Sequence, residues 1–242
     1  IYKIKGELIT SYIYMIEKGM ESVEVSNFYD PEYKNIKISL NTNFTPSENA
    51  QKYFKKYNKL KTAKKEITSQ MEITKEEIDY LENIMLSIEN CENLAELMDI
   101  REELGKVGYL RSKNNSKKET KLTTKPHEFV SSNGFKILVG KNNKQNDNLT
   151  CKLAKKNDLW FHTKDIHGSH VVLRLDKNKK ATDSIIYKCA TIAAYYSKAK
   201  LSQNVPVDYT FIKYVRKPNG AKPGMVIYTD NKTLYVNPKS PS

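Results

Sequence analysis

The residues best suited to chemistry lie in one stretch of the chain, residues 140–172. This stretch holds the only tryptophan, Trp160, and three of the four histidines, which are His162, His167 and His170. A run of side-chain amides follows Gly140: Asn142, Asn143, Gln145 and Asn146. Polar groups beside buried strands cost free energy unless they find partners, and binding groups concentrate on loops carried by a rigid scaffold. The sequence therefore predicts a functional site here.

Metal binding and nucleophilic catalysis are two chemistries that this stretch could support. The spacing H-x4-H-x2-H matches no known zinc motif, which favours core and hydrogen-bonding roles for the histidines. A nucleophile such as Ser169 or Cys151 would need a histidine and an orienting carboxylate, and such triads are assembled in space rather than by adjacency. We therefore expect no metal, no cofactor and no enzymatic activity. A hydrolase that uses His162, His170 and Asp165 remains an alternative.

Nucleic-acid binding suits more of the residues. Lysines neutralise phosphates, amides donate to phosphates, sugars or base edges, and exposed rings stack on unpaired bases. The phosphate-binding candidates are Lys141, Lys144, Lys155, Lys156, Lys164, Lys217 and Lys222. The residues predicted to bind RNA are Lys141, Asn142, Asn143, Gln145, Asn146, Asp147, His162, Asp165, Gly168, Ser169, His170, Lys217 and Lys222. By strand alternation, either Trp160 or its neighbours face inward. We favour Trp160 as a core residue and His162 as the more exposed member of this strand.

The net charge of +13 is concentrated toward the C-terminus. Residues 1–110 carry 15 basic and 19 acidic side chains (net −4), residues 111–125 carry 6 and 1 (net +5), and residues 126–242 carry 20 and 8 (net +12). Such asymmetry indicates a polyanionic partner for the C-terminal part. A basic face that is merely solvated would give the same counts.

Cysteine content, hydropathy and the start of the chain indicate where the protein functions and how much of it the sequence covers. The three cysteines, Cys91, Cys151 and Cys189, are odd in number and widely spaced, which predicts reduced thiols and a cytoplasmic location. No apolar run approaches the length of a membrane span. The chain begins at Ile1, inside a predicted helix, which indicates a fragment of a longer protein.

The elements expected in the first 110 residues are mainly helical. Apolar periodicity predicts a helix over residues 1–18, and alternation over residues 23–25 and 36–38 predicts a β-hairpin. Thr45 and Glu48 form a capping box that starts a helix of about 43 residues, or roughly 65 Å. Its heptad positions are Tyr57, Lys64, Met71, Ile78 and Met85 in one set, and Leu60, Ile67, Thr74, Leu81 and Ile88 in the other.

Such a heptad pattern favours a coiled-coil arm, and we expect self-association through the stripe over residues 57–88. A long helix packed on a globular body is the alternative. A further helix is expected from about Asn93 to Lys106, with Leu94, Leu97, Ile100, Arg101 and Leu104 in phase. Residues 111–125 lack periodicity and are interpreted as a basic linker between domains.

Residues 126–242 are expected to form a mostly antiparallel α+β domain. A hairpin turns at Asn133-Gly134, a short helix covers residues 148–155, and a longer helix runs from Thr182 or Asp183 to about Lys198. Strands are expected at 159–161, 171–173, 207–212, 225–228 and 234–236, with a basic loop at 216–224. The whole chain is thus α+β: a long coiled-coil arm with a small hairpin, then this domain.

Several long motifs resemble the NFACT family, whose members are also called fibronectin-binding protein A-like. The motifs are KGELITSYIY, NFTPSENAQKYFKKYNKLK, HEFVSSNGFKILVGKNNKQNDNLT, DLWFHTKDIHGSHVVLR, AAYYSKAK and VPVDYTFIKYVRKPNGAKPGMVIY. The resemblance covers nearly the whole chain. It implies the family's middle region and coiled-coil arm over residues 1–110, followed by its RNA-binding domain, NFACT-R, over residues 126–242.

The resemblance also implies a function in ribosome quality control. Family members bind large ribosomal subunits that carry a stalled peptidyl-tRNA, recruit tRNA and promote alanine tailing of the nascent chain in bacteria. The partners implied are therefore rRNA of the large subunit and tRNA, with no membrane. The family's N-terminal domains should precede residue 1, so tailing by this fragment alone is not expected. The alternative function is a fibronectin-binding adhesion module.

Overall fold

The structure is a computed structural model that describes residues 1–111, 124–175 and 180–241. It divides into two compact units, Ile1–Lys75 and Glu76–Ser242, and the long helix α2 (Pro46–Glu89) contributes to both. The linker predicted at residues 111–125 lies mostly outside the described residues. Within the described ranges, no helix combines the length and apolar character needed to span a membrane.

The first unit packs a short helix and a hairpin against the start of α2. It contains α1 (Tyr2–Ser11), a 3-10 turn η1 (Ile13–Met15), β1 (Ser22–Ser26) and β2 (Asn35–Ser39). The predicted hairpin is confirmed, with Val23 opposite Ile38. The helix predicted to reach residue 18 ends earlier, because the chain turns at η1 and leaves its side chains largely exposed. The core consists of Leu8, Ile9, Ile16, Val23, Val25, Ile38 and Ala50.

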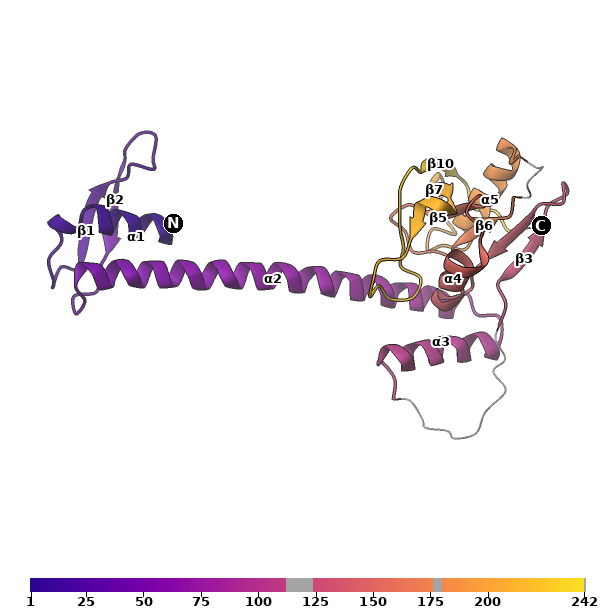
Figure 1. Ribbon diagram of the computed structural model, residues 1–242, viewed down its shortest axis with the longest axis horizontal. Helices are drawn as coiled ribbons and strands as arrows, with labels where there is room; N and C mark the ends of the chain where they lie inside the picture. The colour runs from indigo at the N-terminus through magenta and orange to yellow at the C-terminus, as the bar shows by residue number, and fades with distance from the viewer. Residues whose placement is uncertain (112–123, 176–179, 242) are drawn as a thin grey trace. The chain divides into compact units, whose positions relative to one another are not determined.

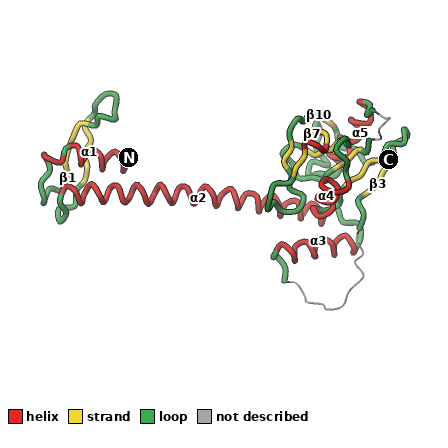
Figure 2. Tube along the Cα trace, in the orientation of Figure 1, coloured by secondary structure: helices red, strands yellow, loops and turns green. Residues whose placement is uncertain are grey.

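Helix α2 begins where its capping box predicts. The carboxylate of Glu48 accepts the Thr45 backbone N–H at 2.7 Å, and the Thr45 hydroxyl accepts the Glu48 N–H at 3.3 Å. The helix then runs for 44 residues, close to the predicted length of about 43 (Figure 2). Six apolar members of the heptad stripe are exposed: Leu60, Ile67, Met71, Ile78, Met85 and Ile88. Self-association through this stripe stays a prediction.

Helix α3 (Leu94–Val107) starts at its N-cap Asn93 and ends at Gly108, which adopts a left-handed φ of 97°. Its buried face differs from the predicted one, because Leu94 is 70% exposed while Glu96, Asp99 and Glu103 are buried beside Ile100. Carboxylates can occupy this face because each has a hydrogen-bonding or charged partner there. Tyr80 of α2, for example, donates its hydroxyl to Glu103 at 2.9 Å.

The second unit is built on a six-stranded sheet in which all neighbours are antiparallel, in the order β10-β7-β5-β6-β4-β3. The strands are β3 (His127–Val130), β4 (Lys136–Val139), β5 (Leu159–Thr163), β6 (Val171–Leu173), β7 (Val205–Phe211) and β10 (Lys232–Val236). The α+β prediction is confirmed, and so is the hairpin at Gly134, whose φ is 72°. The prediction that residues 225–228 form a strand of this sheet is wrong: β9 (Ile227–Tyr228) pairs with β8 (Val215–Arg216) in a separate two-stranded sheet.

The two faces of this sheet carry different layers (Figure 1). Helix α5 (Asp183–Tyr195) covers one face, and its Ile185, Cys189 and Ile192 pack on Phe161 within the largest apolar core. Alternation sends Trp160 to the other face, where it packs with Leu149, Val172 and Ile212. The functional candidates gather around this second face.

Candidate nucleic-acid interface

The amide-rich run forms a helix rather than the loop that the sequence suggested. Helix α4 (Asn143–Asn148) continues directly into a π-helical turn, η2 (Leu149–Leu153). The short helix predicted at 148–155 is confirmed over residues 148–153, but the helical segment begins five residues earlier, at Asn143. The side chain of Asn142 starts α4 early, because its Oδ1 accepts the Gln145 backbone N–H at 2.9 Å as an N-cap.

The four amides are buried, and the side-chain oxygens of Asn142, Gln145 and Asn146 accept backbone N–H groups. Asn146 Oδ1 accepts the backbone N–H of His170 at 3.1 Å, and Gln145 Oε1 accepts that of Lys141 at 3.0 Å. A Cβ at Gly140 would lie only 2.1 Å from Asn146 Oδ1, so this close approach requires glycine. The amides thus fasten residues 140–146 to the start of β6. An RNA contact for them stays a prediction, although their burial gives them a structural role already.

The aromatic cluster on this face agrees with the sequence-based expectation. Trp160 is fully buried, whereas His162 is only half-buried. The Trp160 ring centroid lies 5.7 Å from that of His162, 5.2 Å from that of His170 and 4.9 Å from that of Tyr228. His170 Nδ1 lies 2.7 Å from the Thr150 hydroxyl. Burial lowers the pKa of His162 to about 4 and holds the pKa of His170 well below its ordinary value, so both imidazoles are neutral.

Lowering the pH from 7 to 5 is expected to reduce the free energy of unfolding by up to about 2 kcal/mol for each of His162 and His170. A histidine in the unfolded chain gains a proton below a pH of about 6.5. The folded-state pKa of both side chains is lower. The unfolded state therefore binds more protons in this window, and stability is lost as the pH falls from about 6.5 toward 4. Urea unfolding at pH 5, 6 and 7 measures this loss.

The variant His162→Asn should flatten that pH dependence. The variant His167→Asn is a suitable control because His167 is partly exposed and its Nε2 lies 2.8 Å from Glu82 of α2, outside the cluster. Identical pH profiles for the unchanged chain and His162→Asn would contradict the assignment.

The other candidates of the stretch lie in the turn between β5 and β6. Asp165 is exposed, with a left-handed φ of 53°, while Gly168 and Ser169 are buried. Ser169 donates its backbone N–H to the Tyr196 carbonyl at 3.0 Å. Of the described residues, no three His, Cys, Asp or Glu side chains are grouped as they would be to hold a metal ion.

Most of the lysines predicted to bind phosphate lie within 4.0 Å of an acidic side chain of the same chain: Lys141, Lys144, Lys217 and Lys222. Lys141 Nζ lies 2.5 Å from Glu96 Oε1, and Lys217 Nζ lies 2.5 Å from Asp147 Oδ2. Lys222 Nζ lies 3.0 Å from the Tyr109 hydroxyl and 4.8 Å from the ring centroid of Tyr80. Their positive charge therefore acts first within the protein, and the prediction that they bind phosphate remains untested.

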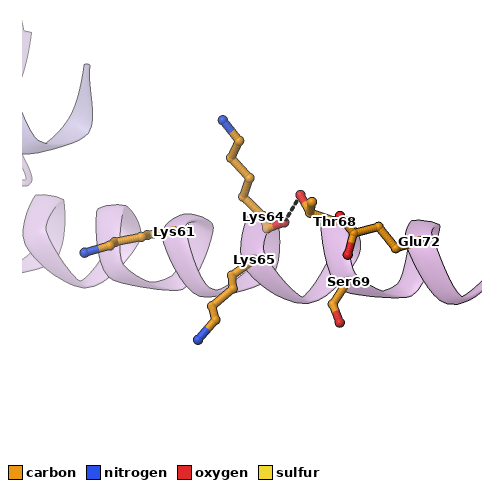
Figure 3. Close-up of a pocket in the computed structure, with 6 residues that line it drawn as sticks. All are labelled: Lys61, Lys64, Lys65, Thr68, Ser69 and Glu72. Carbon is orange, nitrogen blue, oxygen red and sulfur yellow. Dashed lines mark hydrogen bonds between the residues drawn. The ribbon is translucent and has the colours of Figure 1, made fainter. Parts of the chain in front are cut away.

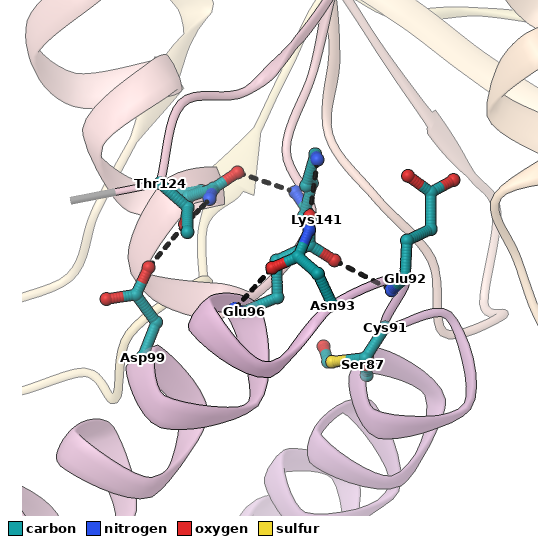
Figure 4. Close-up of polar contacts among 9 residues, drawn as sticks. Ser87, Cys91, Glu92, Asn93, Glu96, Asp99, Thr124 and Lys141 are labelled. Atoms are coloured by element: carbon teal, nitrogen blue, oxygen red, sulfur yellow. Dashed lines mark hydrogen bonds and ion pairs between the residues drawn. The ribbon is translucent and has the colours of Figure 1, made fainter. Parts of the chain in front are cut away.

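The Lys141 contact belongs to a polar network at the start of α3 (Figure 4). Glu96 accepts hydrogen bonds from the Glu92 backbone N–H at 2.9 Å, from Asn93 Nδ2 at 3.0 Å and from Lys141. Burial opposes the ionisation of Glu96, but these three donors together hold its pKa below its ordinary value. Thr124 links the network onward, since its hydroxyl donates to Asp99 and accepts from Gln145 Nε2. This network joins α3 to α4.

The sequence reasoning missed a charge division along α2. Residues 46–65 carry seven lysines and one glutamate (net +6), whereas residues 66–89 carry one lysine and seven acidic side chains (net −6). All seven lysines are exposed, and Lys61, Lys64 and Lys65 line a shallow hollow with Thr68, Ser69 and Glu72 (Figure 3). Counting charge over the first 110 residues together hid this basic surface. Counting it over 20-residue windows would have found it.

Comparison with known proteins identifies the family. Residues 1–123 match the NFACT N-terminal and middle domains, and residues 125–230 match the NFACT protein RNA binding domain. The chain belongs to the NFACT family.

Individual relatives are similar over nearly the whole chain. The Rqc2 homolog RqcH of Bacillus subtilis is 46% identical over 242 residues, covering 98% of this chain and 41% of that protein. The Rqc2 homolog RqcH of Streptococcus suis is 46% identical over 235 residues, with coverages of 97% and 41%. The chain therefore spans about two fifths of these relatives. A solved structure of the C-terminal of the fibronectin/fibrinogen-binding protein from Streptococcus suis has a TM-score of 0.72 and 47% identity, covering 81% of this chain and 77% of that one.

Proposed function

We propose that this chain is the RNA- and ribosome-binding part of a ribosome quality control factor. In this proposal it acts in the cytoplasm by binding rather than by catalysis. The complete protein binds large ribosomal subunits that carry a stalled peptidyl-tRNA and supports alanine tailing of the nascent chain. The contacts of this part are rRNA and tRNA.

The observation that carries the proposal is the match of residues 125–230 to an RNA binding domain, in the part of the chain that carries most of its net positive charge. Residues 126–242 have a net charge of +12, from 20 basic and 8 acidic side chains. A polyanion is the partner that such an excess attracts. The basic half of α2 offers a further surface of the same sign.

The salt dependence of tRNA and rRNA binding by the whole 242-residue chain tests this proposal. We expect the logarithm of the association constant to fall linearly with the logarithm of salt concentration, with a slope of roughly −3 or steeper for about four or more phosphate contacts. Filter binding or fluorescence anisotropy at several salt concentrations measures the slope. No binding at low salt would refute the proposal.

A second function is favoured by one observation, the likeness to the Streptococcus suis structure, which is that of a fibronectin/fibrinogen-binding protein. Surface plasmon resonance with immobilised fibronectin discriminates the two. Saturable binding that survives high salt would support adhesion, whereas weak binding that salt abolishes is what a basic protein shows toward any acidic surface.

A further inference from the structure

We infer that one surface of the second unit, here called the Lys213 ridge, binds an unpaired segment of RNA through both its phosphates and its bases. This inference rests on the RNA-binding function proposed above. The ridge consists of Lys155, Lys156, Phe211, Lys213, Tyr214 and Arg216. It lies where the turn before β5 meets the end of β7.

The backbone of the ridge is fixed by hydrogen bonds between its two segments. The Lys213 N–H donates to the Lys156 carbonyl at 3.2 Å, and the Ile212 N–H donates to the Asp158 carbonyl at 3.0 Å. The buried Asp158 carboxylate accepts the Lys155 backbone N–H at 2.8 Å and pairs with Arg174 at 3.0 Å. The ridge is therefore preorganised, and only the long side chains need to be ordered on binding.

The charge of the ridge is unopposed. Residues 148–157 and 209–217 contain six basic side chains and no acidic one, and of the three bordering aspartates Asp147 pairs with Lys217 and Asp158 with Arg174. The side chains of Lys155, Lys156, Lys213 and Arg216 are exposed, and none forms an ion pair within the part of the chain that the structure describes. This separates them from Lys141, Lys144 and Lys217, whose charges are paired. The ridge, which includes the predicted Lys155 and Lys156, is thus better suited to phosphate than Lys141, Lys144 and Lys217.

Two exposed aromatic rings lie among these basic side chains. Phe211 is 40% exposed and Tyr214 is 36% exposed, and Lys213 Nζ lies 5.5 Å and 4.7 Å from their respective ring centroids. The bases of an RNA duplex are stacked on one another, so a duplex would contact the lysines of the ridge but not its aromatic rings. An unpaired strand presents phosphates and base faces together, which matches lysines interleaved with rings. The partner that fits is therefore single-stranded.

Removing the charges of the ridge tests the phosphate contacts. The whole chain carrying Lys155→Gln, Lys156→Gln and Lys213→Gln is compared with a matched variant carrying Lys180→Gln, Lys200→Gln and Lys239→Gln, three exposed lysines elsewhere in the unit. Binding of a fluorescein-labelled single-stranded oligouridylate is followed by anisotropy at several salt concentrations. The ridge variant should reduce the steepness of the log–log slope by about 2, since each single-strand phosphate contributes about 0.7. The matched variant should change it much less.

Removing the rings tests the base contacts. The variant Phe211→Leu with Tyr214→Leu keeps apolar bulk and every charge, so the salt slope should not change. Affinity for the single strand should fall at least about 5-fold, because each lost base stack weakens binding by that factor or more. Affinity for a blunt-ended RNA duplex, which has no unpaired bases, should be unaffected. Circular dichroism confirms that each variant is folded.

Four results would overturn the inference. Equal slope changes in the two lysine variants would mean that only overall charge matters. An aromatic variant that binds the single strand as tightly as the unchanged chain would remove the base contacts. Failure of the unchanged chain to bind any RNA would refute the proposed function together with the ridge, whereas undiminished binding by the ridge variant refutes the ridge alone.

Discussion

Replacing Lys141 with methionine is expected to lower the free energy of unfolding by about 3–5 kcal/mol. The reason is Glu96, whose side chain is only 2% exposed and whose carboxylate lies 2.5 Å from the Lys141 ammonium. Without that ammonium, a buried carboxylate keeps only its neutral donors, the Glu92 N–H and the Asn93 amide. Urea unfolding of the whole chain, followed by circular dichroism, measures the loss.

A double-mutant cycle separates the charge from the packing of the lysine stem. Glu96→Gln removes the charge while keeping an oxygen acceptor, so the combination of Lys141→Met and Glu96→Gln should recover at least half of the loss. Lys136→Met is the matched control, because Lys136 pairs with Glu128 on the surface and both side chains are about half exposed or more. That surface pair is expected to contribute at most about 1 kcal/mol. Equal losses for the two lysines would contradict a special role for burial.

This result would also change which lysines are assigned to RNA. The sequence ranked Lys141 as a phosphate contact because it stands in a basic, amide-rich stretch. In the structure, its ammonium group donates a hydrogen bond to the carboxylate of Glu96, which lies 45 residues away in the chain. We therefore expect Lys141→Met to leave the salt slope of RNA binding unchanged wherever the variant remains folded.

Local signals predicted the elements well. The Thr45–Glu48 capping box, the Asn133-Gly134 turn and the α5 start at Thr182 all depend on residues within a few positions of one another. These features need no knowledge of distant contacts, which is why the α+β class and the length of α2 could be read from the sequence. The expectation that Trp160 is a core residue is also confirmed, although both faces of β5 are buried, so alternation alone did not decide it.

The candidate site was harder to predict because its partners are distant in the chain. The sequence does not distinguish an exposed amide side chain from a buried one. Asn146 has a structural role because its side-chain oxygen accepts the backbone N–H of His170, a residue distant in the chain. Glu103 on α3 looks solvated by composition, yet Tyr80 and the Lys144 backbone bury it. Burial raises the pKa of Glu103, which no local pattern could indicate. Polar residues are thus the ones whose roles sequence periodicity leaves open.

Replacing Trp160 with alanine is expected to lower the free energy of unfolding by about 3–5 kcal/mol. The indole is fully buried and fills the space between Leu149, Val172 and Ile212, so its removal leaves a large cavity beneath η2. Trp160→Phe should cost less, about 1–2 kcal/mol, because it leaves a smaller cavity. Phenylalanine also removes the indole N–H, a buried donor with no partner among the described residues.

Tyr235→Ala is the control for the loss of an aromatic ring, since Tyr235 is 63% exposed and its removal should change stability by no more than about 0.5 kcal/mol.

The comparison also decides between two roles for Trp160. A core residue affects stability first, and RNA binding by folded Trp160→Phe should match that of the unchanged chain. A ring that stacks on a base would show the opposite pattern, with stability kept and RNA affinity lost. Because Trp160 is fully buried against Leu149, Val172 and Ile212, we expect the first pattern, and the second would require this cluster to open on binding.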